Sequence, residues 1–285
     1  MAPEPRLVET KAELRRWLSA ERKAGRTIGL VPTMGFLHEG HVSLARRARA
    51  ENDRVVMSIY VNPLQFGPKE DFSAYPRDLD GDLRAAGRGG VDVVFHVTDD
   101  EMYPPGFSTH VVPEALVSGL CGARRPGHFR GVTTVVTKLF NLVTPDRAYF
   151  GQKDAQQVAV ILRMARDLDF GLEVVVCATV REPDGLAMSS RNKYLSPEER
   201  GKALVLSRSL AEARRLVAAG ERDARAIRSG LVPSFEGDPA VRLDYLELVD
   251  PGTLEPAARI DRPVLLAVAA FVGKTRLIDN DLLAP

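Results

Sequence analysis

Short apolar runs alternate with amphipathic stretches over the longer, N-terminal part of the chain. The runs are continuous and strand-sized, which is typical of strands buried on both faces, and they lie at 28–31, 55–61, 91–95, 148–150 and 173–180. The stretches between them predict helices at 10–24, 39–51, 80–87, 131–143 and 156–168. Strands that alternate with helices predict a parallel sheet with right-handed crossovers. The expected fold class is therefore α/β, with a Rossmann-like parallel sheet and helices on both of its faces.

The pattern changes after Val180. A turn-rich segment at 181–185 comes first, and the Ser-Pro-Glu-Glu sequence at 196–199 then has the residues of a helix start. The rest predicts a helix to about 218, a shorter one at 224–230, and strands at 241–249 and 264–272. We therefore expect two domains, 1–179 and a smaller α+β domain at 180–285.

The overall composition limits the classes of function. The 285 residues are 45% hydrophobic and 27% charged, which is ordinary for a globular enzyme. A formal net charge of +1 provides no basic field for a long nucleic acid, although it does not exclude a small nucleotide. Charged residues interrupt the N-terminus and no apolar run could span a bilayer, so we expect neither a signal peptide nor a membrane partner. Two well-separated cysteines favour a reducing cytoplasm.

The junction at 29–41 carries the clearest chemical signal. An apolar run stops at Pro32, a glycine turn follows, and His38 and His41 arrive as the next helix begins. Backbone N–H groups at a helix start carry partial positive charge and favour phosphate as a ligand. Three residues of spacing puts both imidazoles on one helical face, and the helix dipole opposes further positive charge there. We expect two neutral rings that donate hydrogen bonds to phosphoryl oxygens, hence a nucleotide site.

Two other interpretations of this junction remain open. A His-x-x-His pair is also found in zinc sites, but Cys121 and Cys177 have no ligand spacing and no acidic partner lies nearby in sequence. A single histidine would more often be an ordinary core or surface residue. Two histidines beside Thr33, Gly35 and Gly40 at a strand exit favour the nucleotide site.

Two further polar segments, 62–65 and 151–154, also follow predicted strands. The carboxyl ends of parallel strands share one edge, so both segments could line one crevice with the histidine pair. In the second segment Gly151 permits close backbone approach and Lys153 could place a cation over phosphates, while Asp154 caps the next helix or orients Lys153. No Gly-Lys-Ser/Thr sequence occurs in the required context, so this is not a Walker A loop.

A loop at the expected domain boundary contains Met188-Ser189-Ser190-Arg191. Serine hydroxyls donate single hydrogen bonds and a guanidinium spreads charge over phosphate oxygens, so the loop suits an oxyanion. By itself the tetrad is weak, because such sequences are common on solvated loops. Together with the histidine junction it predicts a second side of the nucleotide site.

These motifs together resemble a known family. The segments 32–35 and 38–41 are similar to the signature of the nucleotidyltransferase superfamily. The whole set resembles the pantothenate synthetase family, in order from about 28 to 195 and more weakly beyond. The segments that carry this resemblance are 61–66, 75–77, 125–132, 150–154, 156–157 and 188–192.

The resemblance implies ATP-dependent condensation of (R)-pantoate with β-alanine, through a pantoyl adenylate, to pantothenate, AMP and pyrophosphate. Such an enzyme needs no nucleophile of its own, which fits the absence of a Ser-His-Asp or Cys-His arrangement. The resemblance also implies small-molecule substrates, Mg²⁺ with ATP, and a homodimer. The metal ligands stay unassigned: Asp80 and Asp82 could meet Mg²⁺ through water, or be solvated residues on a helix face.

The resemblance carries site roles onto matching residues. His41, His38 and Lys153 are the expected catalytic groups, with His41 as the main donor. Gln65 and Gln157 are expected to bind pantoate, and Gln65 also β-alanine, because a neutral amide orients a carboxylate without quenching its nucleophilicity. The domain at 1–179 would bind ATP and pantoate, and the domain at 180–285 would close over the ATP site. The expected ATP ligands are Met34, Gly35, Phe36, Leu37, His38, Glu39, Gly40, His41, Gly151, Gln152, Lys153, Asp154, Val180, Met188, Ser189, Ser190 and Arg191.

Two functional alternatives stay open, namely another nucleotidyltransferase of the same superfamily and a non-catalytic nucleotide sensor. The segment 66–90, with its glycines, prolines and charges, is a candidate lid that would protect the anhydride from water. For His128, whose neighbours Gly127 and Gly131 suit a turn into a helix, we favour a structural role.

Overall fold

A computed structural model describes residues 4–68 and 70–285. Its larger sheet has six strands in the order β1-β4-β3-β2-β5-β6, and every neighbouring pair is parallel. The chain builds outward from β2 in one direction and from β5 in the other, so the point of reversal lies between these strands. Ligands bind at such reversal points, beyond the carboxyl ends of the strands. The strands are β1 (Arg6–Val8), β2 (Ile28–Thr33), β3 (Arg54–Ile59), β4 (Val93–His96), β5 (Arg147–Gly151) and β6 (Glu173–Cys177).

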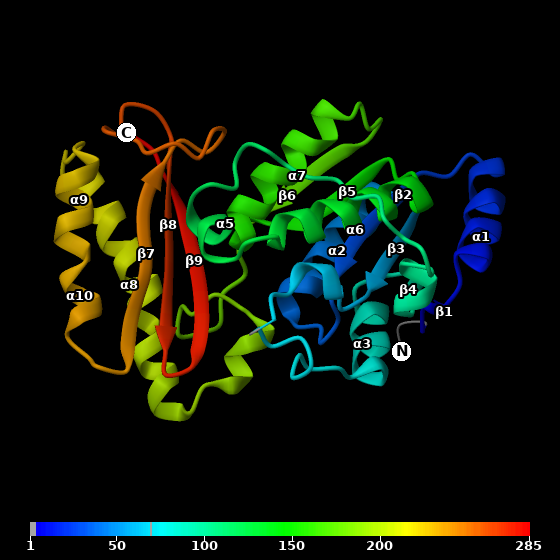
Figure 1. The fold of residues 1–285 in the computed structure, drawn as a ribbon, viewed down its shortest axis with the longest axis horizontal. Helices are drawn as coiled ribbons and strands as arrows, with labels where there is room; N and C mark the ends of the chain where they lie inside the picture. Colours follow the sequence, from blue (N-terminus) through cyan, green and yellow to red (C-terminus); the bar gives the residue numbers. More distant parts are fainter. Residues whose placement is uncertain (1–3, 69) are drawn as a thin grey trace.

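Helices cover both faces of this sheet (Figure 1). One face packs against α1 (Lys11–Lys23), α6 (His128–Val143) and α7 (Ala155–Asp167). The other packs against α2 (Glu39–Glu51) and α3 (Leu79–Arg88). Shorter elements connect them at α4 (Asp99–Met102), α5 (Leu120–Arg124), η1 (Pro63–Gln65) and η2 (Gln152–Asp154).

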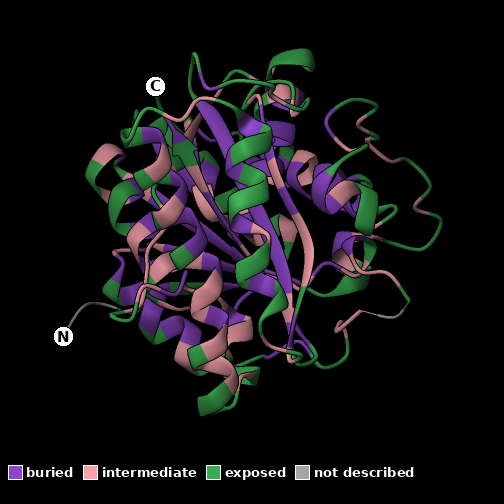
Figure 2. Cartoon of the chain, turned by 90° about the vertical axis from the view of Figure 1, so that its left-hand side faces the viewer, coloured by how far each residue is buried: buried purple, intermediate pink, exposed green. Residues whose placement is uncertain are grey.

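The C-terminal part forms a second sheet of three antiparallel strands, β7 (Val241–Val249), β8 (Val264–Val272) and β9 (Thr275–Leu283). It lies beside the parallel sheet along the long axis of the molecule (Figure 1). Its helices have exposed outer faces and cover the buried strands behind them (Figure 2). They are η3 (Ser190–Tyr194), α8 (Pro197–Ala218), α9 (Ala224–Leu231) and α10 (Pro233–Glu236).

The strand β9 connects the second sheet to the segment that follows β5 of the first sheet. Its Asn280 side chain donates to the backbone carbonyls of Gln152 (2.9 Å) and Lys153 (2.8 Å). One residue earlier, Asp279 is 3% exposed and pairs with both terminal nitrogens of Arg181, at 2.7 and 3.0 Å. The end of the chain therefore helps to fix the backbone next to the site.

The predicted fold class is confirmed, with two strands that the sequence pattern missed. The first, β1, is three residues long with one buried side chain, so it has no visible periodicity. The second, β9, buries Asp279 and Asn280 among its apolar residues, which hides the alternation that predicts a strand. Two predicted strands end early, at Ile59 and Cys177, because the residues after them leave the ladder for the site.

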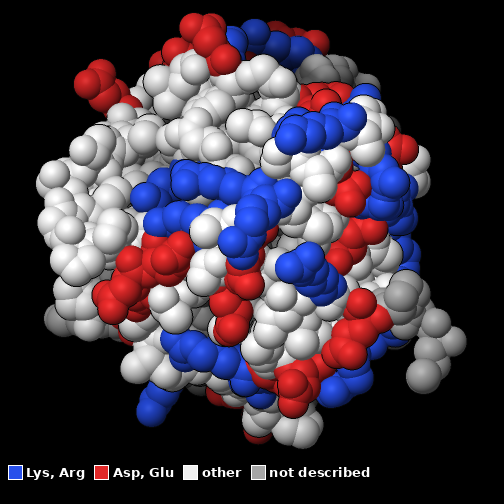
Figure 3. Space-filling model, turned by 90° about the vertical axis from the view of Figure 1, so that its right-hand side faces the viewer, with Lys and Arg blue, Asp and Glu red and all other residues white. Residues whose placement is uncertain are grey.

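One face of the molecule has mixed charge. On the face drawn in Figure 3, basic and acidic side chains are interspersed rather than gathered into a field of one sign. Within the described residues, no helix has the length and apolarity needed to cross a membrane.

Candidate active site

The strand β2 delivers a tightly held turn to the carboxyl edge of the sheet. Thr33 donates from its hydroxyl to the Ser58 carbonyl (2.6 Å) and accepts the Gly35 N–H (3.2 Å). Gly35 and Phe36 then have left-handed backbones, with φ of +83° and +51°. The turn ends at His38, the extended residue that precedes helix α2.

The two imidazoles lie together, with ring centroids 4.1 Å apart. They do not share a helical face as predicted, because His38 lies outside the helix and only His41 is within its first turn. The His41 Nδ1 atom accepts the His38 backbone N–H at 3.3 Å. An accepting Nδ1 requires the proton of a neutral ring to be on Nε2, so His41 has one free donor.

Both rings are neutral at pH 7, and burial is the largest cause. Burial lowers the pKa of His38 to about 4, and the Lys153 ammonium adds to this effect. Burial also lowers the pKa of His41 well below its usual value, with smaller contributions from His38 and Lys153. Desolvation and a nearby cation therefore act in the same direction as the helix dipole that the sequence indicated. We call His38, His41 and the turn 33–37 the imidazole wall.

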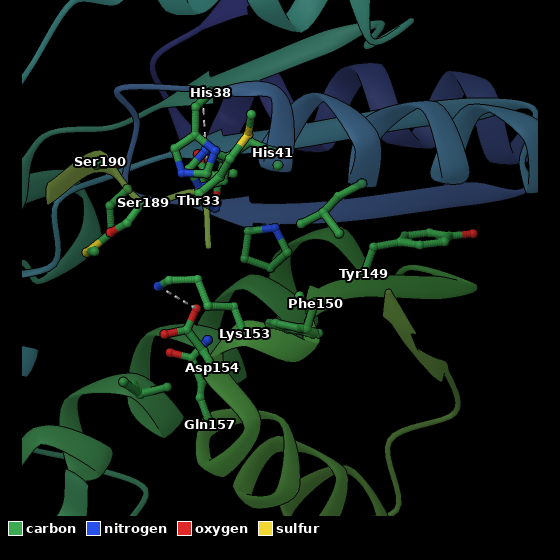
Figure 4. A pocket seen from close by; sticks show the side chains of 18 of the residues that line it. Thr33, His38, His41, Tyr149, Phe150, Lys153, Asp154, Gln157, Ser189 and Ser190 are labelled. Atoms are coloured by element: carbon green, nitrogen blue, oxygen red, sulfur yellow. Dashed lines mark hydrogen bonds and ion pairs between the residues drawn. The ribbon is translucent and has the colours of Figure 1, made fainter. Parts of the chain in front are cut away.

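Lys153, Asp154 and Gln157 face the histidines across a cavity (Figure 4). Lys153 and Asp154 follow strand β5 in the short helix η2. Asp154 precedes helix α7, but its side chain makes no capping hydrogen bond, and its carboxylate lies 3.9 Å from the Lys153 ammonium. Of the two roles predicted for Asp154, the structure favours orientation of Lys153.

Ser189, Ser190 and Arg191 form a third side of the cavity, which we call the serine–arginine wall. The Ser190 hydroxyl donates to the Phe36 carbonyl at 3.3 Å and so joins this wall to the turn. The Arg191 guanidinium makes a two-point ion pair with Asp71, at 2.9 and 3.1 Å. Asp71 belongs to the candidate lid, so a lid carboxylate occupies the arginine fork that was predicted to bind phosphate.

Gln65 is placed by close packing of η1 on helix α6. A Cβ at Gly131 would collide with the Leu64 carbonyl, so only glycine permits this approach. The Gln65 amide contacts the Met34 sulfur at 2.9 Å, and Asn62 donates to its oxygen at 3.2 Å. The side chain is thereby fixed at the cavity edge.

His128 supports this corner, in the structural role that we favoured. Its Nδ1 donates to the Gln65 carbonyl (2.8 Å), and its Nε2 accepts from Arg125 (2.9 Å). Burial, with the Arg125 charge, lowers the pKa of His128 to about 4. Arg125 in turn pairs with Glu70 at 2.6 Å.

The cavity brings together fourteen of the predicted site residues. Its volume is about 210 Å³, and it continues into a larger cavity of about 840 Å³ through shared lining residues, Lys153, Asp154, Gln157, Ser189 and Arg191. The predicted residues in its lining are Met34, His38, Gly40, His41, Gln65, Gly151, Lys153, Asp154, Gln157, Val180, Met188, Ser189, Ser190 and Arg191.

Five predicted ATP ligands lie outside this lining: Gly35, Phe36, Leu37, Glu39 and Gln152. Gly35 and Phe36 shape the turn, and Leu37 packs into the core beneath it. Glu39 is exposed and pairs with Arg46, while Gln152 bonds to Asn280.

The sequence analysis did not predict two features of the cavity, namely an apolar wall from helix α6 and the hydroxyl of Thr179. Val132, Val135, Val136 and Leu139 repeat at helical spacing along α6 and line the cavity, although that pattern only predicts a buried helix face. Thr179 also lines it, and its hydroxyl is buried without a hydrogen-bond partner among the described residues. Its position just after β6, at the carboxyl edge, was the signal that could have found it.

The two helix carboxylates, Asp80 and Asp82, differ. Asp80 is exposed, as expected for a solvated residue, and lines neither cavity. Asp82 is 3% exposed, and its carboxylate accepts the backbone N–H groups of Phe36 and Leu37. A solvated role for Asp82 was therefore wrong. Burial raises the pKa of Asp82, and the two backbone donors oppose this shift.

The described residues include no group of three or more His, Cys, Asp or Glu side chains placed to hold a metal ion. The histidine pair thus lacks the further protein ligands of a zinc site. Cys121 and Cys177 are both free thiols.

Comparison with known proteins gives one consistent family. The profile of the family described as pantoate-beta-alanine ligase matches residues 6–282. Pantothenate synthetase of Thermotoga neapolitana is 58% identical over 278 residues, covering 98% of this chain and 99% of the relative. That of Moorella thermoacetica is 57% identical over 277 residues, covering 97% and 98%.

Solved structures agree with these relatives. A crystal structure of pantothenate synthetase from Thermus thermophilus has a TM-score of 0.93 and 49% identity, and the match covers 98% of this chain and all of that one. Pantoate-beta-alanine ligase from Francisella tularensis, complexed with beta-gamma ATP and beta-alanine, has a TM-score of 0.80 and 31% identity, covering 98% and 97%.

Proposed function

The chain belongs to the pantoate-beta-alanine ligase family and is a ligase that joins pantoate to β-alanine; we propose that it does so through a pantoyl adenylate, formed from ATP in the cavity between the imidazole wall and the serine–arginine wall. One observation carries this proposal: both walls and Lys153 line the same cavity. A triphosphate between them would meet neutral donors on one side and cations on the other.

The reaction has two displacement steps. A carboxylate oxygen of pantoate attacks the α-phosphorus of ATP, which forms the acyl phosphate bond and releases pyrophosphate as the bond to the β-phosphate oxygen breaks. The amine of β-alanine then attacks the acyl carbon, the amide forms, AMP leaves, and the amine gives up a proton. The enzyme supplies in-line positioning and neutralises charge on the phosphates.

Lys153, His38 and His41 are the groups that we assign to the first step. A neutral His41 keeps its Nε2–H for hydrogen bonding to phosphoryl oxygen, since Nδ1 already accepts a backbone N–H. Lys153 brings the positive charge, held beside Asp154 in the cavity. Arg191 and Ser189 would meet the remaining phosphate oxygens once Asp71 releases the guanidinium, while the Ser190 hydroxyl donates to the Phe36 carbonyl and holds this wall against the turn.

The pantoate subsite is assigned to Gln65, Gln157 and the apolar face of helix α6. Pantoate has a carboxylate, two hydroxyls and a carbon that bears two methyl groups. The two amides offer donors and acceptors for its polar end, and Val132, Val136 and Leu139 offer an apolar surface for its methyl groups. Gln65 is also assigned to β-alanine.

Mg²⁺ is proposed to accompany ATP. Asp154 is a carboxylate of the cavity lining and is half-exposed, so it can meet a hydrated cation. Mg²⁺ typically uses one or two carboxylates, substrate phosphates and several waters, so a three-ligand protein cluster is not required. Bound to ATP, the ion would neutralise phosphate charge.

The decisive experiment omits β-alanine. With ATP and pantoate, the enzyme should form bound pantoyl adenylate and release pyrophosphate in an amount close to that of enzyme, and added β-alanine should convert the adenylate to pantothenate and AMP. AMP formation without pantoate would overturn the ligase mechanism. Tight ATP binding without turnover would favour the nucleotide sensor, and transfer to another acceptor would favour a different nucleotidyltransferase.

We also propose that the residues from 180 to 285 close over ATP as a unit and that the protein works in the cytoplasm.

We further propose that the protein is a homodimer. Strand β6 ends the parallel sheet, so one of its edges is unpaired there, and Val176 on it is 40% exposed. Two exposed leucines lie nearby: Leu162 belongs to helix α7, which packs on this strand, and Leu168 directly follows the helix. Such an edge is a natural pairing surface. Light scattering should give twice the chain mass, and Val176→Lys should lower it if this edge is the interface.

A further inference from the structure

The glycine turn of the imidazole wall has an unusual backbone. Gly35 and Phe36 are consecutive left-handed residues, and Phe36 carries a side chain in a region that L-residues rarely adopt. Backbone N–H groups after such residues converge and attract an anion. Here the anion is part of the chain.

Asp82 of helix α3 fills this position. Its Oδ2 accepts the Phe36 N–H at 2.8 Å and its Oδ1 accepts the Leu37 N–H at 2.6 Å. The carboxylate is 3% exposed and packs so closely on the turn that a Cβ at Gly35 would lie 2.9 Å from Oδ2. Two charge-assisted bonds thus compensate part of the cost of burying this charge.

Phe36 joins three separate parts of the chain. Its N–H is bonded to Asp82, near the end of the candidate lid segment, and its carbonyl accepts the Ser190 hydroxyl of the serine–arginine wall. Its ring lies 4.1 Å from the ammonium of Lys193. The conformation of this one residue therefore sets how the turn meets both neighbouring segments.

We propose that Asp82 is a positioning residue for the nucleotide: its carboxylate holds Phe36 in the left-handed conformation and so keeps His38, His41 and Ser190 in the arrangement that binds ATP. The inference rests on the proposed function of this turn as a nucleotide site. It assigns Asp82 neither contact with substrate nor a metal.

The test measures the Kd of ATP by calorimetry, without pantoate, for the wild type, Asp82→Asn and the control Asp80→Asn. Asparagine presents an NH₂ group where the carboxylate accepted a backbone N–H, so one bond is lost and two donors face each other. We expect ATP binding to weaken about 10- to 100-fold in Asp82→Asn. Asp80→Asn, on the same helix but exposed, should bind ATP like the wild type.

A rescue variant separates positioning from general stability. Glycine adopts the left-handed conformation without strain, so in the Phe36→Gly background the turn needs the carboxylate less. Asp82→Asn should therefore weaken ATP binding by less than about 5-fold in that background. Equal losses in both backgrounds, or an unchanged Kd in Asp82→Asn, would overturn the inference.

Two further measurements cover the cases in which Asp82→Asn does not fold or the wild type makes no pantoyl adenylate. If Asp82→Asn does not fold, Gly35→Ala disturbs the same contact from the other side, and a folded Gly35→Ala with normal ATP affinity would also overturn the inference. If the wild type binds ATP but makes no pantoyl adenylate, the proposed function fails, while the ATP affinities still decide the role of Asp82.

Discussion

The two walls of the cavity are built in opposite ways. The imidazole wall consists of neutral, buried rings on a turn that is held by hydrogen bonds from within the parallel-sheet part of the chain. The serine–arginine wall is a loop whose charged member is engaged by a lid carboxylate. Under the proposed function, the first wall is already in position for the nucleotide, whereas Asp71 has to release Arg191 before the second wall can bind phosphate. In this proposal, one segment is preorganised for the nucleotide, and a different segment exchanges a protein carboxylate for phosphate.

The largest expected effect tests the preorganised wall. His41→Ala should lower kcat by about 10²- to 10⁴-fold with a modest change in ATP affinity, because a donor to the transition state is lost. Steady-state kinetics with ATP varied at saturating pantoate and β-alanine would measure it. A variant with nearly normal kcat would remove His41 from the catalytic role and leave the imidazole wall as a binding surface.

Gln157→Ala tests whether Gln157, which lines the cavity between the two walls, contacts pantoate specifically. Losing a hydrogen bond to a charged substrate should raise the pantoate KM by about 10- to 100-fold and the ATP KM much less. Arg166→Ala, an exposed residue of the same helix, serves as control. Equal rises in both KM values would argue against a specific pantoate contact.

His128→Gln tests the buried, neutral His128 ring, which donates to the Gln65 carbonyl, through the pH dependence of the free energy of unfolding. The unfolded chain protonates this ring near its usual pKa of about 6.5, and the folded one only near 4. Between these values the unfolded state binds more protons, so the free energy of unfolding falls as pH falls. From pH 6.5 to 4.5 the wild type should lose about 2 kcal/mol more than the variant. Urea unfolding at both pH values would measure this, and parallel losses would contradict the buried neutral ring.

The smallest expected effect tests the exchange at the second wall. Asp71→Asn removes a carboxylate that competes with phosphate for Arg191, so the KM for ATP should fall by about 2- to 5-fold, as for a partly exposed ion pair. The exposed Asp80→Asn again provides the control. A higher KM would show that Asp71 assists binding rather than competing with it.

The fold was largely predictable, because most elements are long and regular in pattern. The continuous apolar strands and the amphipathic helices α2, α7 and α8 appear close to their predicted bounds. The strand β9 could not be predicted, because tertiary hydrogen bonds and the ion pair of Asp279 replace the apolar pattern on its buried side.

The site was predictable as a set of segments but not as a set of contacts. The histidines and Lys153 follow strand ends and therefore lie at one cavity, as the topology of a parallel sheet favours. The serine–arginine loop lines the same cavity, where Ser190 bonds to the turn. The pairing of Asp71 with Arg191 and the burial of Asp82 depend on where distant segments pack. No local pattern contains that information, so Asp82 resembled an ordinary helix-surface acid.

The hydrogen bonds from Asn280 connect strand β9 to the backbone that lines the cavity. The Asn280 side-chain amide donates hydrogen bonds to the Gln152 and Lys153 carbonyls and so fixes the backbone that carries the Lys153 amine. Removing residues 280–283 would delete these hydrogen bonds to the backbone of Gln152 and Lys153. The stability of strand β9 is therefore coupled to the position of Lys153 in the cavity, so a variant that weakens β9 should also displace this side chain.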